Sequence, residues 1–166
     1  MTEVASSSAS SHPNVAAVVE AARAQGLDIE VREFPDGTRT AQDAAAAIGV
    51  DVAQIVKSLA FRVDDRIVMA LVSGPDRLDE AKLATVAGGT EVGRADADAV
   101  RAATGYPIGG VPPFGHRSPL PTFVDRRLLD HAEVWAAAGT PRHVFAITPA
   151  ELVRVTGAPP ADLAVG

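Results

Sequence analysis

Residues 54–74 read QIVKSLAFRVDDRIVMALVSG, which is two β-rich runs separated by Asp64 and Asp65. Isoleucine, valine and phenylalanine favour strands, and a short polar break between two such runs is typical of a hairpin turn. We therefore predict an antiparallel hairpin at this point of the chain. Lys57 stands out, because it is a charged residue among the apolar residues of the first run.

Helix and strand signals continue on both sides of this hairpin. Val15, Val18, Val19 and Ala22 follow the spacing of one helix face, and Gly26 supplies a stop. In chain order, the other patterns predict a strand at 27–34, a helix after Thr40 ending at Gly49, a helix at 80–89 capped by Asp79, a strand at 91–93, a helix at 96–105, strands at 121–125, 132–139 and 142–147, and a helix at 148–157.

This mixed order of helices and strands favours an α/β (α+β) fold, in one domain around a mixed, curved sheet. The 166 residues suffice for one domain with its own core. We expect residues 1–12 to form a disordered tail and residues 13–166 to form the domain, with no secretory signal and a cytoplasmic location. No apolar run approaches the ~18 residues that span a bilayer, so we expect no membrane association.

Composition excludes several classes of function. The net charge of −6 argues against broad wrapping of nucleic acid, and no DNA partner is expected, although a few local cations could hold one end of an RNA. The absence of cysteine removes disulfides, cysteine metal sites and a cysteine nucleophile. No histidines and carboxylates fall at metal-ligand spacing, so we expect neither a metal nor another cofactor.

The sequence GYPIGGVPPFGH, residues 105–116, predicts a stiff apolar loop. Gly109 and Gly110 allow unusual backbone angles and leave their amides uncovered, while Pro107, Pro112 and Pro113 fix φ and carry no N–H group. A rigid rim of exposed amides suits an oxyanion or a polarised carbonyl. The alternative is a structural crossover loop.

Three further residues are candidates for the site, each with a structural alternative. The Lys57 ammonium needs water, a partner or an anion, and would otherwise point outward from a half-exposed strand, with Ser58 on the opposite side. Asp125 ends the strand PTFVD and could serve only as a cap for the next turn. His143 opens a strand and could be a polar edge residue. No nucleophile with a partner base is found, so the site suits holding better than attacking.

Four segments, QIVKSL, GYPIGGVPPFG, LPTFVD and TPAELVRVTGA, resemble in the same order the YbaK/prolyl-tRNA-synthetase-associated editing domain family. The resemblance runs from about residue 14 to residue 158. It implies a mixed, barrel-like sheet surrounded by helices, and an aminoacyl-tRNA deacylase, either freestanding or inserted in a prolyl-tRNA synthetase. The substrate would be the activated ester at the 3′-terminal ribose, attacked by water, the ribose hydroxyl or a group of the substrate itself.

The resemblance also implies roles for individual residues. Lys57 would hold the terminal phosphate or orient the adenosine, and Gly109, Gly110 and Gly115 would present amides to the ester carbonyl. The remaining candidates for substrate contact, some of which have structural alternatives, are Ser58, Val111, Pro113, Asp125 and His143. Some relatives carry serine at the position of Pro112, so this chain lacks one hydroxyl near the site.

Three functions follow from these observations. The first is a trans-editing hydrolase that clears mischarged tRNA by binding its 3′-terminal CCA end, with the tRNA delivered by a synthetase or an elongation factor. The second is a non-catalytic module that binds aminoacyl-tRNA ends or an adenine nucleotide. The third is a domain that binds another small acid at the glycine loop. The first requires the Lys57 ammonium and the loop amides to share one cavity, while the amino acid and the tRNA stay open.

Overall fold

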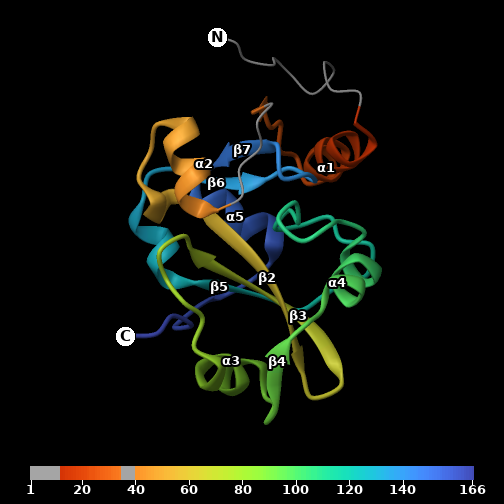
Figure 1. Cartoon of the computed structure of the whole chain (residues 1–166), viewed down its shortest axis with the longest axis vertical. Coiled ribbons are helices and arrows are strands. Elements are labelled where there is room, and N and C mark those ends of the chain that lie inside the picture. Colours follow the sequence, from red (N-terminus) through yellow and green to blue (C-terminus); the bar gives the residue numbers. More distant parts are fainter. Residues whose placement is uncertain (1–11, 35–39) are drawn as a thin grey trace.

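The computed structural model describes residues 12–34 and 40–166 and has an α+β fold (Figure 1). The predicted tail lies outside the described residues except for His12. The helices are α1 (Pro13–Ala24), α2 (Ala41–Ile48), α3 (Glu80–Ala87), α4 (Ala97–Thr104) and α5 (Pro149–Thr156), with 3-10 helices η2 (Val52–Gln54) and η3 (Arg126–Asp130). The strands are β1 (Val31–Glu33), β2 (Val56–Val63), β3 (Arg66–Ser73), β4 (Val92–Arg94), β5 (Thr122–Asp125), β6 (Val134–Ala137), β7 (His143–Ile147) and β8 (Pro160–Ala161).

The predicted hairpin is the centre of the larger sheet. β2 and β3 pair antiparallel over their whole lengths, from Val56 opposite Ser73 to Val63 opposite Arg66. The strand order is β4-β2-β3-β5-β8, and the β3–β5 and β5–β8 pairs are parallel, which confirms the prediction of a mixed α+β fold.

A second, antiparallel sheet has the order β1-β7-β6. A single parallel bridge, Ile55 to Trp135, joins the start of β2 to β6. Within the described residues the strands therefore form two sheets rather than one, and no closed barrel.

The helix signals in the sequence are confirmed at both ends of most helices. The hydroxyl of Thr148 accepts a hydrogen bond from the Glu151 amide, and Gly157 ends α5 with φ +65°. Thr40, Asp79 and Asp96 cap α2, α3 and α4 in the same way, and each of these helices ends at a glycine in the left-handed region.

Two strands are several residues shorter than predicted, and one strand was not predicted. Only 31–33 of the predicted strand 27–34, and only 134–137 of the predicted strand 132–139, pair with β7. β8 was not predicted, since it has two residues and contains Pro160, which a sequence pattern excludes from all but edge strands.

The main core lies between the two sheets and α1. The four apolar residues that predicted α1 are all buried there, and α5 adds Leu152 and Val155. Phe145 of β7 is fully buried and meets Phe114 of the glycine-rich loop edge-to-face, with ring centroids 5.8 Å apart. This contact fixes the loop to the three-stranded sheet.

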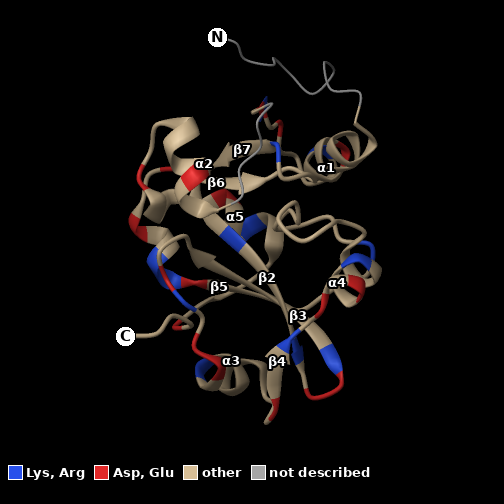
Figure 2. Cartoon of the chain, viewed as in Figure 1, with Lys and Arg blue, Asp and Glu red and all other residues tan. Residues whose placement is uncertain are grey.

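Charges of both signs are spread over the helices and strand ends (Figure 2), and the glycine-rich loop at 105–116 contains no Lys, Arg, Asp or Glu. In the described part of the chain, every helix is too short or too polar to cross a bilayer.

Phe145→Ala should lower the free energy of unfolding by about 3–5 kcal/mol, because it removes a fully buried ring and leaves a cavity against Phe114. Urea denaturation followed by circular dichroism measures the change. Val86→Ala, at a residue with 38% of its surface exposed, is the control and should change stability by less than about 0.5 kcal/mol. Equal midpoints for Phe145→Ala and the wild type would contradict this view of the core.

Candidate functional site

A cavity of about 280 Å³ opens where the two sheets meet. Helix α2, the start of β2, strands β6 and β7 and the glycine-rich loop all contribute to its walls. The lining residues are mainly small or apolar: Thr40, Ala41, Ala44, Ile55, Val56, Lys57, Ser58, Gly109, Val111, Trp135, Ala136, Ala137, Thr140, Pro141, His143 and Val144. Of the predicted site residues, the cavity brings together Lys57, Ser58, Gly109, Val111 and His143.

Lys57 lines this cavity, and its ammonium is hydrogen-bonded to the loop that follows β3. Strand alternation places its side chain on the face of β2 that carries Leu59 and Phe61, and Nζ donates to the main-chain oxygen of Asp76, 2.6 Å away. Burial lowers the pKa of Lys57, the carboxylate of Asp76 opposes this shift, and Arg94 adds to it. Burial thus weakens the preference of this amine for its charged form.

Ser58 and Trp135 hold the polar atoms with unused hydrogen-bonding capacity. Within the described residues, neither Ser58 Oγ nor Trp135 Nε1 has a hydrogen-bond partner, although both atoms are buried. An unsatisfied buried group costs about 1–3 kcal/mol. A ligand that reached either group would recover part of that cost.

The glycine-rich loop differs from its prediction in how it uses its amides. Gly109 lies at the cavity with φ +89° and is exposed, whereas the Gly110 amide donates to the oxygen of Pro107, 2.9 Å away. Gly110 O also accepts from the Gly139 amide at 2.9 Å. The prediction that both amides are uncovered is therefore wrong for Gly110, because its backbone closes a turn and packs on the β6–β7 connection.

Close packing explains two of the glycines. A Cβ at Gly110 would lie 2.7 Å from Cα of Thr140, and a Cβ at Gly115 would lie 2.6 Å from Cβ of Ala21 on α1. Gly115 also has φ +73°, which disfavours any side chain. Neither glycine lines the cavity, and Pro113 is buried away from it.

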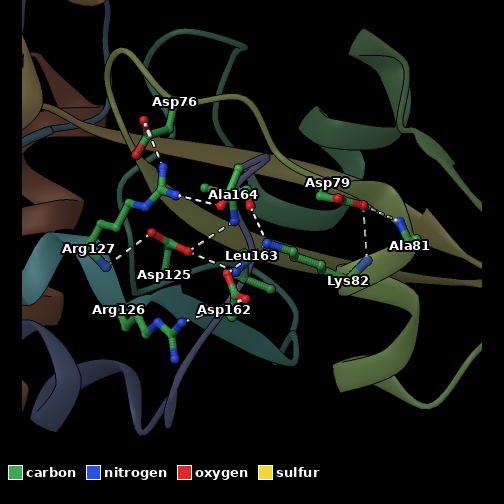
Figure 3. Close-up of polar contacts among 11 residues, drawn as sticks. Asp76, Asp79, Ala81, Lys82, Asp125, Arg126, Arg127, Asp162, Leu163 and Ala164 are labelled. Carbon is green, nitrogen blue, oxygen red and sulfur yellow. Dashed lines mark hydrogen bonds and ion pairs between the residues drawn. The ribbon is translucent and has the colours of Figure 1, made fainter.

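Asp125 also lies outside the cavity wall. Its carboxylate is 1% exposed and accepts backbone N–H groups from Arg127, Leu163 and Ala164 at 3.1, 2.8 and 3.1 Å. Figure 3 shows these contacts converging on it. Of the two roles that the sequence left open, its contacts are those of the structural one.

His143 is a buried imidazole at the cavity wall. Nδ1 lies 2.6 Å from Oγ1 of Thr140, which already accepts from the Arg142 amide. This favours a hydroxyl that donates to Nδ1, with the ring proton on Nε2, which lies 3.8 Å from Glu33 Oε2. Burial lowers the pKa of His143 although Glu33 opposes the shift, so the ring is neutral near pH 7.

The three-stranded sheet places the positively charged side chain of Arg32 beside the cavity. Arg32 of β1 lies opposite the cavity residue Val144 of β7. Its guanidinium is 5.3 Å from the ring centroid of Phe34 and 5.4 Å from that of Trp135. The arrangement joins a positive charge to flat apolar surfaces, which is a combination that holds single-stranded nucleotides in many proteins.

Apart from His143, the sequence analysis missed the cavity residues of α2 and of the β6–β7 region. Trp135 had one available signal, as the only tryptophan of the chain, in a run of alanines. Thr140 and the alanines of α2 had none, because their role depends on which elements pack together. In the two described stretches no group of three or more potential ligands is arranged for a metal ion.

Known proteins and a family model are similar to this chain. The model of the family described as "Aminoacyl-tRNA editing domain" matches residues 35–155. A protein proposed as a trans-editing enzyme for prolyl tRNA synthetase has a crystal structure that superposes with a TM-score of 0.89 at 47% identity, covering 95% of this chain and 100% of that one.

Curated relatives are either short proteins or parts of long ones. The uncharacterized protein YwhH of Bacillus subtilis is 32% identical over 124 residues, which are 74% of this chain and 78% of that protein. The proline–tRNA ligase of Desulforamulus reducens is 37% identical over 91 residues, which are 55% of this chain but only 16% of the ligase.

Gly110→Ala should destabilise the protein by about 1–3 kcal/mol, because the new methyl group would meet backbone atoms that have no room to move. Thermal unfolding measures the change. Gly93→Ala is the matched control, since a Cβ there meets nothing within 4 Å. Equal unfolding temperatures for the two variants would show that Gly110 is not a packing residue.

Proposed function

The chain belongs to the aminoacyl-tRNA editing domain family, and on this premise we propose that it is a deacylase that hydrolyses the ester of mischarged tRNA. The observation that carries the proposal is the shared cavity. Lys57, Gly109 and His143 come from three separate segments and line one space at the meeting of two sheets. This shared space supports a common role for these three residues, which the resemblance also links in sequence.

The proposed reaction needs little from the protein beyond position. The oxygen of a water molecule attacks the ester carbonyl carbon, and the bond from that carbon to the ribose oxygen breaks. The ribose oxygen takes up a proton and the products are the free amino acid and the tRNA. The aminoacyl ester is already activated, so orientation of the attacking group supplies the main part of the rate enhancement.

We assign the site residues by where they lie. Lys57 holds the phosphate or ribose of the terminal nucleotide, and Gly109 and Val111 present the loop backbone to the ester. His143, neutral and fixed by Thr140, contacts the amino acid or its ester. Four residues act without contacting the substrate, by holding the loop and the strand ends in place: Gly110, Pro113, Gly115 and Asp125.

The size and lining of the cavity favour a small amino acid. Four alanines, of α2 and β6, and three valines form much of the wall. Such a wall favours an apolar side chain over a hydroxyl-bearing one, so we propose alanine before serine or threonine as the amino acid removed. The similarity to proline–tRNA ligases and to a proposed prolyl-tRNA trans-editing enzyme makes tRNA for proline the first tRNA to test.

We propose that Arg32, on its aromatic neighbours, contacts the bases next to the terminal nucleotide. The chain carries a net charge of −6, so a few such cations cannot hold a whole tRNA strongly. A synthetase or an elongation factor that delivers the tRNA in the cytoplasm fits this charge.

One observation favours a non-catalytic binding module instead. Among the residues that line the cavity, only Lys57 and His143 titrate, and none is a carboxylate that could serve as a general base. Binding of aminoacyl-tRNA without loss of the amino acid would establish this alternative.

Lys57→Ala should reduce deacylation of alanyl-tRNA for proline at least 100-fold while the protein stays folded, because one half-buried cation orients the substrate but contributes little to stability. Release of labelled alanine measures the rate. Arg62→Ala is the control, an exposed cation on the same strand β2, and should keep the wild-type rate. Full activity in Lys57→Ala would remove Lys57 from the site.

Ala44→Val should make the enzyme more selective for the smallest amino acid. Ala44 lines the cavity from α2, so two added methyl groups reduce the space for the side chain of the substrate. We expect the ratio of kcat/KM for alanyl- to threonyl-tRNA to rise about tenfold, since one methyl group in such a pocket is worth about 1–3 kcal/mol. Ala102→Val, at an exposed position of α4, is the control, and an unchanged ratio in Ala44→Val would place the amino acid elsewhere.

A further inference from the structure

The last residues of the chain form part of a polar cluster that reaches Lys57. Leu163 and Ala164 donate their amides to the buried carboxylate of Asp125 (Figure 3). Nζ of Lys82 donates to Oδ1 of Asp162 at 3.0 Å and to the oxygen of Ala164 at 2.7 Å. The C-terminal segment, residues 162–166, is therefore held from both β5 and α3.

This segment pairs with the loop between β3 and α3. The Asp79 amide donates to Leu163 O at 2.7 Å, and the Val165 amide donates to Arg77 O at 2.8 Å. Leu78 and Ala164 form an antiparallel bridge between these two bonds. The pairing fixes the backbone of the loop immediately after Asp76.

Arg127 closes the cluster from η3. One guanidinium nitrogen lies 3.3 Å from Oδ1 of Asp76, and the other donates to the oxygen of Gly166 at 3.1 Å. Figure 3 shows Arg127 extended between Asp76 and the C-terminal segment. Asp76 is also fixed by its own amide, which donates to Ser73 O at 3.0 Å.

Lys57 also contacts this loop, because its ammonium donates a hydrogen bond to Asp76 O. A lysine has four rotatable carbon bonds, so its ammonium has a defined place only where an acceptor is itself fixed. The loop, Arg127 and the C-terminal segment provide such an acceptor.

We propose that Asp76 and Arg127 are positioning residues for Lys57, and that the C-terminal segment acts through them to fix the ammonium beside the cavity. The proposal rests on the deacylase function for its consequence in catalysis. Its physical content, the coupling of Asp76 and Arg127 to the Lys57 ammonium, is independent of that function.

The charge of Asp76 supplies a readout specific to this coupling. The charged groups that act on Lys57 are Asp76, which raises its pKa, and Arg94 of β4, which lowers it, while Arg127 faces Asp76. Asp76→Asn keeps the main-chain oxygen but removes the negative charge. The pKa of Lys57 should then fall, because its ammonium loses a favourable charge and stays equally buried.

The chain has only two lysines, Lys57 and Lys82, so a titration by NMR of protein labelled at the lysine side chains gives two signals. Lys57→Arg assigns them by removing one. The expected result is a Lys57 midpoint at lower pH in Asp76→Asn than in the wild type. Asp65→Asn makes the same change of charge at an exposed position in the turn of the β2–β3 hairpin, and should leave the Lys57 midpoint unchanged.

Arg127 is tested by kinetics. Arg127→Gln should lower kcat/KM for deacylation about 10- to 100-fold through misplacement of the ammonium, and Arg127→Lys should restore most of it. A Lys57 midpoint that is the same in Asp76→Asn and the wild type overturns the proposal. So does a loss of thermal stability in Arg127→Gln with kcat/KM unchanged, since it would make the cluster purely structural. If the wild type hydrolyses no aminoacyl-tRNA, the deacylase function fails while the titration still decides the coupling.

Discussion

The hydrogen bond from the Lys57 ammonium to Asp76 O is the interaction on which the organisation of the site depends. β2 brings this lysine to the meeting of two sheets, where burial makes a free ammonium costly. A carbonyl on a fixed loop satisfies it, and that loop is held in turn by the C-terminal segment and by Arg127. The last residues of the chain thus connect to the site without lining it.

The glycine-rich loop combines a binding surface with a packing surface. Gly109 and Val111 face the cavity, while Gly110 packs on Thr140 with no room for a side chain. The turn that exposes Gly109 is closed by the amide of Gly110, which donates to the oxygen of Pro107. Phe114 anchors the far end of the loop on Phe145, so a segment with few side chains keeps one conformation.

The cavity fits the proposed hydrolysis, whose substrate is an activated ester. Its walls are mainly small or apolar residues, and its titratable groups are one lysine and one neutral histidine. Small apolar walls select by size, and fixed polar groups orient an ester without attacking it. This division fits the editing family, in which the proposed chemistry requires positioning more than a nucleophile.

The sequence by itself determined the elements and the family. Caps such as Thr148, stops such as Gly157 and the spacing of Val15, Val18 and Val19 are local signals, and the structure confirms them. It also indicated Lys57 and the glycine loop, since a charge in an apolar strand and a run of glycine and proline are visible without a fold. Tertiary structure decided the rest: the split into two sheets, the cavity residues of α2 and Trp135, and the partners of Asp76 and Asp125. These depend on contacts between segments far apart in the chain, such as residues 125 and 163, and no local pattern encodes which distant backbone group will satisfy a buried charge.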